Sequence, residues 1–421
     1  TGPGATGPRS VSQSDHGEAT PSGMSLEDAH GGRPVVSPGS FAGQGHQAPQ
    51  RATGADRPAY CIYTSGTTGK AKGVLVAHRG FAAGVTEASR LLGLGPHTRA
   101  LCVSPFHFDG SYSTLFSVPA AGGFLAIPRR ESLMFPRIFF KSLREEQINH
   151  TSCAPSYLRL LLSSKQMSEL AGGPLRTLAL GGEACVAAEV EQLWTAAPDL
   201  RVFNRYGPTE AVIAVTTYEL HEESVHPGSP VPIGPPHEGV SFVLVGDDQA
   251  VIDTPGEVGE LYIGGVQLMS RYWREPELTS AVMRPDIVEG EVLYRTGDLA
   301  LRDTAGVYTC LGRADSVIKR SGVRISTVEL AEAVRQAAGV NVAHCASYDN
   351  DGQLGIACFA VSAVPLDTAD IRAGVFDRLP YTMVPDVIEV TARLPLTSNG
   401  KIDEPRLLAD AGLRTWRSVG S

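Results

Sequence analysis

Residues 63–73, with the sequence Tyr-Thr-Ser-Gly-Thr-Thr-Gly-Lys-Ala-Lys-Gly, combine groups that can bind a polyphosphate. Their glycines permit a tight turn whose N–H groups point toward a ligand. Their hydroxyl side chains supply neutral donors, and their lysines supply positive charge. The spacing is not that of a Walker A loop. The segment therefore predicts a phosphate-binding loop of another kind, in which the candidate contacts are Thr64, Ser65, Gly66, Thr67, Thr68, Gly69, Lys70 and Lys72.

Two further segments carry groups that suit a nucleotide. In residues 204–210, Tyr206 can stack on a purine, Thr209 can bond a phosphate oxygen and Glu210 can hold Mg²⁺. In residues 294–299, Asp298 follows a glycine and can accept both hydroxyls of a ribose. Each segment alone is also compatible with a solvated turn.

The composition narrows the class of protein. The chain has 421 residues and a formal net charge of −9, which argues against a nucleic-acid partner. Its seven cysteines show no metal-ligand spacing, so we expect buried thiols in a reducing cytoplasm. The N-terminus lacks the basic start and apolar core of a signal peptide, and the longest apolar run, residues 115–128, is too short to span a bilayer. We therefore expect a cytoplasmic protein without a membrane partner.

The elements that must position these residues follow an α/β pattern. Residues 1–58 are rich in Gly, Ser, Pro and Ala without hydrophobic periodicity, so a disordered low-complexity segment is expected there. From residue 59 to residue 314, short apolar runs alternate with helical patterns, which predicts a large domain of mixed or parallel sheets flanked by helices. Strands are expected at residues 101–103, 124–127, 178–180, 202–203, 240–245 and 259–265, and helices at 138–146, 157–162 and 188–196.

A different pattern begins at Asp315. A hairpin is expected at residues 316–325, helices at 328–338 and 369–379, and strands at 342–347 and 355–361, followed by a Pro/Gly-punctuated tail. Residues 315–415 are therefore expected to form a small C-terminal α+β lid domain.

The motifs closely resemble those of the adenylate-forming superfamily, which includes nonribosomal-peptide adenylation domains, acyl-CoA ligases and luciferases. They occur in the superfamily's order from Tyr63 to Asp403. The resemblance implies an acid–AMP-forming, acid–thiol ligase that uses ATP and Mg²⁺. By the same resemblance, Tyr206 contacts adenine, Thr209 the α-phosphate and Glu210 the metal. It adds Gly182, Glu183 and Asn204 to the nucleotide site, Asp298 and Arg313 to the ribose site, Asp315 as hinge and Lys401 as the catalytic lysine.

Residues 104–111 resemble two branches of this superfamily. The segment Phe-Asp-Gly-Ser at 108–111 resembles that of amino-acid-activating domains, in which Asp109 binds the ammonium; the alternative is that Asp109 pairs with Arg205. His107, after Phe106, resembles the aromatic gate of acyl-CoA ligases. Arg205 either binds a second carboxylate of the substrate or fills space. The resemblance lines the substrate pocket with Asp109, Gly110, Ser113, Ser152, Ala179, Gly181, Arg205, Ile213 and Ala214.

The sequence leaves two thiol acceptors open. Residues 315–325 carry Val317 where peptide synthetases usually have Gln, and they are closer to acyl-CoA ligases. The resemblance therefore implies a pantetheine thiol, either of a carrier protein or of CoA.

The superfamily normally carries a folded portion ahead of the phosphate loop, and we find nothing like it in residues 1–58. A truncated, inactive relative that binds a nucleotide or a partner is therefore an alternative to an enzyme. We also expect self-association, or a partner protein, to cover apolar strand surface that the missing portion would bury.

Overall fold

The computed structural model describes residues 54–65, 71–128, 133, 135–227, 229–314, 317–320, 323–340, 342–350, 353–379, 383–396 and 402–415. Residues 51–421 form one compact unit. Within the described residues, no helix combines the length and apolarity needed to cross a membrane.

A six-stranded sheet has the order β4-β3-β5-β6-β7-β8. All neighbours pair in parallel except β7 and β8, which are antiparallel. The chain leaves β3 toward β4 on one side and then returns to β5 on the other, so the order reverses between β3 and β5. The strands are β3 (Arg99–Cys102), β4 (Phe124–Ala126), β5 (His150–Cys153), β6 (Thr177–Gly181), β7 (Arg201–Arg205) and β8 (Tyr218–Leu220).

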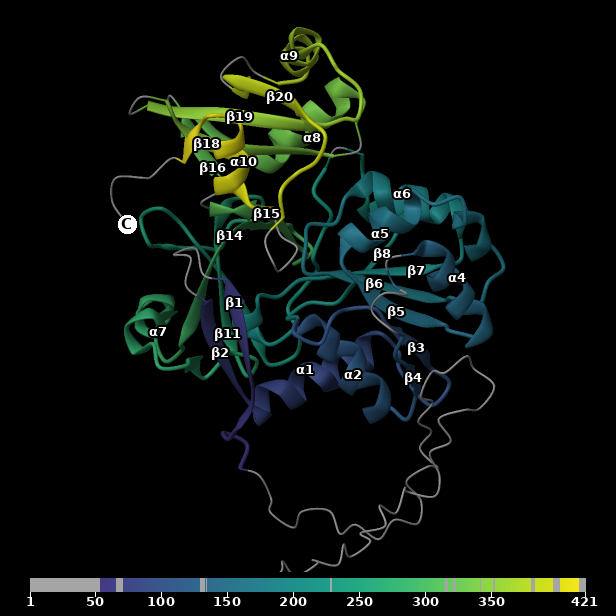
Figure 1. Cartoon of the computed structure of the whole chain (residues 1–421). Helices are drawn as coiled ribbons and strands as arrows, with labels where there is room; N and C mark the ends of the chain where they lie inside the picture. Colours follow the sequence, from purple (N-terminus) through teal and green to yellow (C-terminus); the bar gives the residue numbers. More distant parts are fainter. Residues whose placement is uncertain are drawn as a thin grey trace, which may run out of the picture. The chain divides into compact units, whose positions relative to one another are not determined.

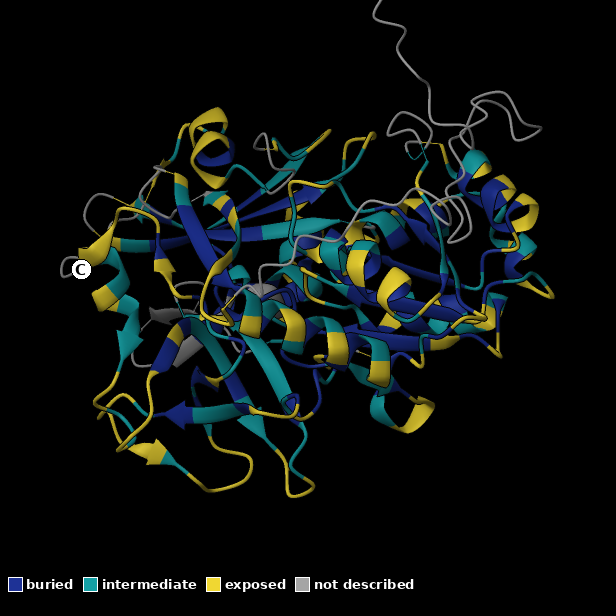
Figure 2. Cartoon of the chain, turned by 90° about the horizontal axis from the view of Figure 1, so that it is seen from below, coloured by how far each residue is buried: buried dark blue, intermediate teal, exposed yellow. Residues whose placement is uncertain are grey.

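Helices cover both faces of this sheet (Figure 1). Leu178 and Leu180 pack with the helices of one face, whereas Ala179 packs with α1 on the other, because successive residues of a strand alternate between faces. Figure 2 shows these strands largely buried and the helices with exposed turns. The first face carries α4 (Pro136–Glu145), α5 (Pro155–Leu162) and α6 (Ala187–Ala196), and the second carries α1 (His78–Leu91) and α2 (Gly110–Ala120). Short 3₁₀ turns are η2 (Met167–Leu170), η3 (Thr209–Ala211) and η4 (Glu222–Ser224).

The glycine-rich segment lies between two antiparallel strands, as the sequence predicted. β1 (Pro58–Ser65) and β2 (Ala71–Ala77) pair up to Ser65 and Ala71, and β12 (Arg271–Tyr272) pairs with β2. Residues 66–70 of the loop lie outside the described residues. Residues 54–58, which we placed in the low-complexity segment, bond to the start of α1: the carbonyls of Ala55 and Arg57 accept from the N–H groups of Arg79 and His78, each at 2.9 Å.

An antiparallel sheet of order β10-β9-β11-β14-β13, with β15 also paired to β14, carries the predicted ribose motif. Residues 294–299 lie inside β14, where the register with β11 slips between Glu260 and Tyr262. Gly297 has a φ of 75° at this irregularity, so the glycine ahead of Asp298 lies in a bulge within a strand and not in a solvated turn. The elements are β9 (Val240–Val245), β10 (Val251–Ile252), β11 (Val258–Gly265), α7 (Pro276–Val282), β13 (Met283–Arg284), β14 (Leu293–Arg302) and β15 (Tyr308–Arg313).

The C-terminal residues form a hairpin and a four-stranded sheet of order β20-β19-β18-β21. Side chains of α8 and α9 pack on one face of the sheet and those of α10 on the other. The expected tail contains three further elements, β20, α10 and β21, which the sequence analysis missed. The elements are β16 (Val317–Arg320), β17 (Val323–Ser326), α8 (Thr327–Ala338), β18 (Ala343–Asn350), β19 (Gln353–Val361), α9 (Thr368–Phe376), β20 (Val387–Thr391), α10 (Glu404–Asp410) and β21 (Arg414–Thr415).

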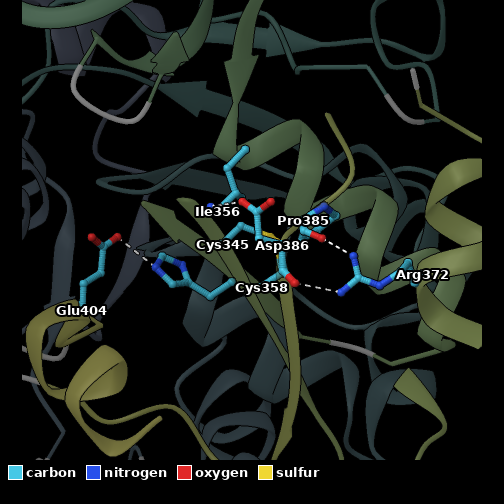
Figure 3. Close-up of a disulfide and its surroundings, with 8 residues drawn as sticks. Cys345, Ile356, Cys358, Arg372, Pro385, Asp386 and Glu404 are labelled. Carbon is cyan, nitrogen blue, oxygen red and sulfur yellow. Dashed lines mark hydrogen bonds and ion pairs between the residues drawn. A yellow bond between two sulfur atoms is a disulfide. The ribbon is translucent and has the colours of Figure 1, made fainter. Parts of the chain in front are cut away.

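A disulfide corrects the expectation of reduced thiols for two of the seven cysteines. Cys345 of β18 and Cys358 of β19 occupy facing positions, with Cα atoms 4.1 Å apart, and their sulfurs are bonded (Figure 3). Nearby, the Asp386 carboxylate accepts from the Ile356 N–H at 2.8 Å, and Arg372 donates to the carbonyls of Pro385 and Asp386. The bond was not predicted, because the sequence alone does not give the register of the two strands.

This bond gives a direct prediction. Thiol titration of the unfolded chain should find five reactive cysteines before reduction and seven afterwards. Because the bridge closes a short loop, with a sequence separation of 13, replacing both cysteines with alanine should cost about 3 kcal/mol of stability. Seven reactive thiols without reductant would contradict the bond.

Candidate active site

The predicted substrate residues converge at the carboxyl ends of the parallel strands. Ser152 pairs in register with Ala179, and Gly181 with Arg205. Ala179 packs on the face that α1 and α2 cover. Gly181 lies two residues further along β6 and therefore points to the same face, and Arg205 is its partner in register on β7. Open parallel sheets bind ligands outside these strand ends, where the strand order reverses. Asp109, which follows β3, and Ser152, near the end of β5, flank that reversal.

Asp109, at the start of α2, is half-buried, and its Oδ2 atom is buried. Its Oδ2 atom has no hydrogen-bond partner among the described residues. Burial raises the pKa of Asp109 to about 6, although the Thr209 side chain and the backbone amides of Gly110 and Ile213 favour the ionised form. Asp109 does not pair with Arg205, so that alternative is not what the structure forms. A buried carboxylate oxygen without a partner is suited to receive a cation from a ligand.

Arg205, the last residue of β7, is buried, and among the described residues its side chain forms hydrogen bonds only to neutral groups. Its Nη1 atom donates to the Ser113 hydroxyl of α2, and its Nε atom donates to the Thr217 hydroxyl at 3.2 Å. Burial lowers the pKa of Arg205 to about 10, which leaves it protonated at neutral pH.

A chain of buried and partly buried hydrogen bonds runs from Arg205 to a strained loop. Thr217 contacts His237 Nε2 at 3.0 Å, and His237 Nδ1 contacts Gln267 Oε1 at 3.0 Å. Gln267 Nε2 then donates to the carbonyls of Val212 and Ala214 at 3.2 and 2.8 Å.

The loop that Gln267 holds is strained at consecutive β-branched residues. Val212 and Ile213 have φ values of 57° and 68°, a region that such side chains rarely adopt. Ile213 and Ala214 are both predicted pocket residues, so the strain lies where a ligand would bind. The Gln267 amide fixes the backbone on both sides of Ile213.

The predicted adenosine residues lie together. The Tyr206 hydroxyl donates to Asp298 Oδ2 at 2.5 Å, and Arg313 Nη1 lies 3.3 Å from Asp298 Oδ1. Gly297 makes this approach possible, because a Cβ there would lie 2.7 Å from Arg313 Nη2. The structure thus brings an aromatic ring, a carboxylate and a guanidinium into one cluster, groups that can stack on a base and bond a ribose.

The predicted metal ligand, Glu210, forms an ion pair with a residue of the phosphate-loop hairpin. Lys72 Nζ lies 2.8 Å from Glu210 Oε1, and the Tyr272 hydroxyl donates to the same oxygen at 2.6 Å. Burial raises the pKa of Glu210, but the charge of Lys72 and the two hydrogen bonds outweigh burial and hold the pKa below its usual value. An ionised carboxylate is a ligand that Mg²⁺ prefers.

Glu210 is not part of a larger cluster of metal-binding side chains in the described part of the chain. Within the described residues, no three His, Cys, Asp or Glu side chains form a metal-binding group. Mg²⁺ commonly uses one or two carboxylates together with water and substrate phosphates, so Glu210 as a single protein ligand fits that ion.

Other predicted residues have structural partners or lie at the edge of the cluster. Glu183 bonds the backbone N–H and hydroxyl of Ser156 at the start of α5, at 2.9 and 2.7 Å. The Asn204 amide donates to the Pro232 carbonyl at 2.8 Å. Gly182 has a φ of 85° with open space beside it, and Gly110 is exposed. Thr64 lies on β1, and its buried hydroxyl has no partner among the described residues. His107 is exposed, with its ring 4.6 Å from that of Phe108. Gly66, Thr67, Thr68, Gly69, Lys70, Asp315, Lys401 and the side chain of Ser65 lie outside the described residues.

Sequence reasoning missed four polar residues of the site. Thr217, His237 and Gln267 connect Arg205 to the strained loop, and Tyr272 binds Glu210. None belongs to a motif that we identified. Tyr272 pairs in register with Val74 of β2, and only the pairing of β12 with β2 brings it to Glu210.

The fold is that of the adenylate-forming enzymes. The crystal structure of holo-AB3403, a four-domain nonribosomal peptide synthetase bound to AMP and glycine, matches with a TM-score of 0.71 and 28% identity, over 82% of this chain and 25% of that one. The chain belongs to the family of AMP-binding enzymes, whose model matches residues 7–273, more than half of its length. The match begins ahead of the first motif that we identified.

The similar curated proteins are long synthetases. Tyrocidine synthase 3 of Brevibacillus parabrevis is 33% identical over 353 residues, which is 83% of this chain and 5% of that protein. Bacitracin synthase 3 of Bacillus licheniformis is 32% identical over 358 residues, covering 84% of this chain and 6% of that protein. The chain therefore spans a small part of the relatives that it matches.

Proposed function

We propose that the chain activates an α-amino acid with ATP and transfers it to the phosphopantetheine thiol of a carrier protein. The observation that carries this proposal is Asp109, a half-buried residue whose buried Oδ2 atom has no partner within the described part of the chain. A substrate ammonium would supply both the charge and the hydrogen bonds that this oxygen lacks. The relatives, which are peptide synthetases, and the AMP- and glycine-bound structure support the same substrate class.

The proposed reaction has two steps. A carboxylate oxygen of the amino acid forms a bond to the α-phosphorus of ATP, the bond from that phosphorus to the bridging oxygen breaks, and pyrophosphate leaves. The pantetheine thiolate then attacks the carbonyl carbon of the aminoacyl-adenylate, and AMP leaves with its electron pair. Because the reaction consumes ATP, we propose a cytoplasmic location, where the Cys345–Cys358 disulfide would be unusual.

The residues divide the work between binding and charge stabilisation. Tyr206, Asp298 and Arg313 would hold the adenosine, and Glu210 would hold Mg²⁺, which stabilises charge on the phosphates when bound. Lys401 would approach the carboxylate during the first step, and the hinge at Asp315 would withdraw it before the second.

The test is amino-acid-dependent exchange of labelled pyrophosphate into ATP, with a panel of α-amino acids and their deamino analogues. A charge-assisted ammonium contact contributes about 1.5–3 kcal/mol, so removing the amine should reduce exchange roughly ten- to a hundred-fold. Equal or better exchange with acids lacking the amine would instead indicate an enzyme of the acyl-CoA-ligase type. No exchange with any acid would indicate a nucleotide- or partner-binding relative without this activity.

A further inference from the structure

Arg205 is a buried cation without a carboxylate partner. The residue is 7% exposed, and within the part of the chain that the structure describes it forms no ion pair. Its guanidinium uses one N–H on Ser113 and one on Thr217, which leaves three of the five N–H donors of an arginine for another partner. A buried arginine is ordinarily paired, because removing an isolated charge from water is unfavourable.

The groups around Arg205 do not neutralise its charge. Burial, together with the charge of Arg205, lowers the pKa of His150 to about 3 and that of His237 to about 4, so both imidazoles are neutral at pH 7. Ser113 and Thr217 are hydroxyls. This end of the predicted pocket therefore carries one uncompensated positive charge.

The negative charge of Asp109 lies on the face of α2 that also carries Ser113, the residue that contacts Arg205. Asp109 and Ser113 are four residues apart at the start of α2, so their side chains lie on one side of the helix, about 6 Å apart along its axis. Ser113 contacts the guanidinium, whereas the Asp109 carboxylate forms no bond with it. An anion and a cation are thus held near each other, and neither has the other as its partner.

Gly181, the partner of Arg205 on the neighbouring strand, has no side chain and leaves the space beside Arg205 free. A Cβ at Gly181 would lie 3.0 Å from the Arg205 carbonyl oxygen and 3.3 Å from the Arg205 Cβ. A larger residue at position 181 would therefore require Arg205 to shift by a few tenths of an ångström.

We propose that the amino acid activated by this site carries a second carboxylate in its side chain, and that Arg205 binds that carboxylate. This inference rests on the proposed function, since it takes Asp109 as the ammonium site. An acidic α-amino acid presents an ammonium and a side-chain carboxylate a few bonds apart, which matches one buried anion and one buried cation along one helix face. The planar guanidinium fork binds a carboxylate through paired hydrogen bonds, which a neutral amide does not reproduce.

The first experiment needs only the wild-type chain. Pyrophosphate exchange is compared between glutamate and glutamine and between aspartate and asparagine, pairs that differ in charge at nearly constant shape. We expect the preferred acid to exceed its amide at least about tenfold in kcat/KM, as expected for a charge-assisted contact. Exchange with neutral amino acids in preference to both acids would overturn this inference and leave the proposed function standing. No exchange at all would instead overturn the proposed function.

The second experiment separates a binding role for Arg205 from a structural one. In Arg205→Met, the preference for acid over amide should fall to about one, and the melting temperature should hold or rise, because an apolar side chain relieves an unpaired buried charge. The acidic amino acid alone should raise the melting temperature of the wild type but not of this variant. Arg201→Met is the matched control: Arg201 lies on the same strand, exposed and paired with Glu219, and its loss should leave the preference unchanged. A lower melting temperature with an unchanged preference in Arg205→Met would show that Arg205 only supports the fold.

Discussion

Replacing Asp109 with asparagine should stabilise the folded chain and, at the same time, remove most of its activity toward α-amino acids. The pKa of this carboxyl rises from 3.8 to about 6, chiefly through burial, so the ionised form is less favourable in the folded chain than in the unfolded one. A shift of this size corresponds to roughly 3 kcal/mol at most. Asparagine keeps the size of the side chain and removes the charge.

The sign of this shift sets the pH dependence. Below about pH 4 the carboxyl is protonated in both the folded and the unfolded chain and does not affect stability. Between about pH 4 and pH 6 it ionises first in the unfolded chain, so the stability of the folded chain falls as pH rises. The advantage of Asp109→Asn in chemical denaturation should therefore be largest above pH 6 and vanish toward pH 4. Asp286→Asn is the control: Asp286 is exposed, and Arg284 holds its pKa below the usual value, so no such gain is expected.

Activity supplies the second half of this prediction. Exchange with α-amino acids should fall roughly ten- to a hundred-fold in Asp109→Asn, because the ammonium loses its charged partner. If the variant is instead less stable than the wild type at pH 7.5, Asp109 is an anion that the fold needs.

Replacing Glu210 with glutamine should have the opposite effect on stability and a larger effect on activity. The change leaves Lys72 without its counter-ion, and breaking a buried pair from one side costs about 3–5 kcal/mol; the lower end applies because Lys72 is 23% exposed. Adenylation should fall at least about a hundred-fold, as when a group that stabilises transition-state charge is removed. The Mg²⁺ concentration that gives half-maximal exchange should rise.

Tyr272→Phe is the matched variant for this experiment. It removes the hydroxyl that donates to Glu210 Oε1 and accepts from Lys72 Nζ at 2.7 Å, but it keeps the ion pair of Lys72 with Glu210. About 1–2 kcal/mol of stability should therefore be lost, and the Mg²⁺ requirement should change little. Full activity with an unchanged Mg²⁺ requirement in Glu210→Gln would show that Glu210 serves only as the counter-ion of Lys72.

The sequence predicted the elements whose signal is local. The apolar runs of β3, β4, β6 and β7 and the periodicity of α4, α5 and α6 were recognised within a few residues of their bounds. β5 was missed because His150–Cys153 has no apolar run, although all four of its residues are buried in the sheet. Its neighbours, and not its own side chains, make this segment a strand.

Site residues that belong to a sequence motif could be predicted, whereas residues that only tertiary contacts bring to the site could not. Tyr206 and Asp298 are 92 positions apart, yet each belongs to a recognisable motif, and the structure joins them. The bonds from Arg205 through Thr217, His237 and Gln267 depend on strand register and loop conformation, for which the sequence has no local pattern. The positive φ of Val212 and Ile213 was equally hidden, because β-branched residues ordinarily indicate an extended backbone.

The most direct measurement of the central claim follows the carboxylate oxygens of the substrate. The chain is incubated with ATP and an amino acid labelled with ¹⁸O in its α-carboxylate, and hydroxylamine is added as the acceptor. If the carboxylate attacks the α-phosphorus, the adenylate retains a labelled bridging oxygen, and mass spectrometry should find one ¹⁸O atom in each AMP released. Formation of ADP, or of AMP without label, would contradict amino-acid activation through an adenylate.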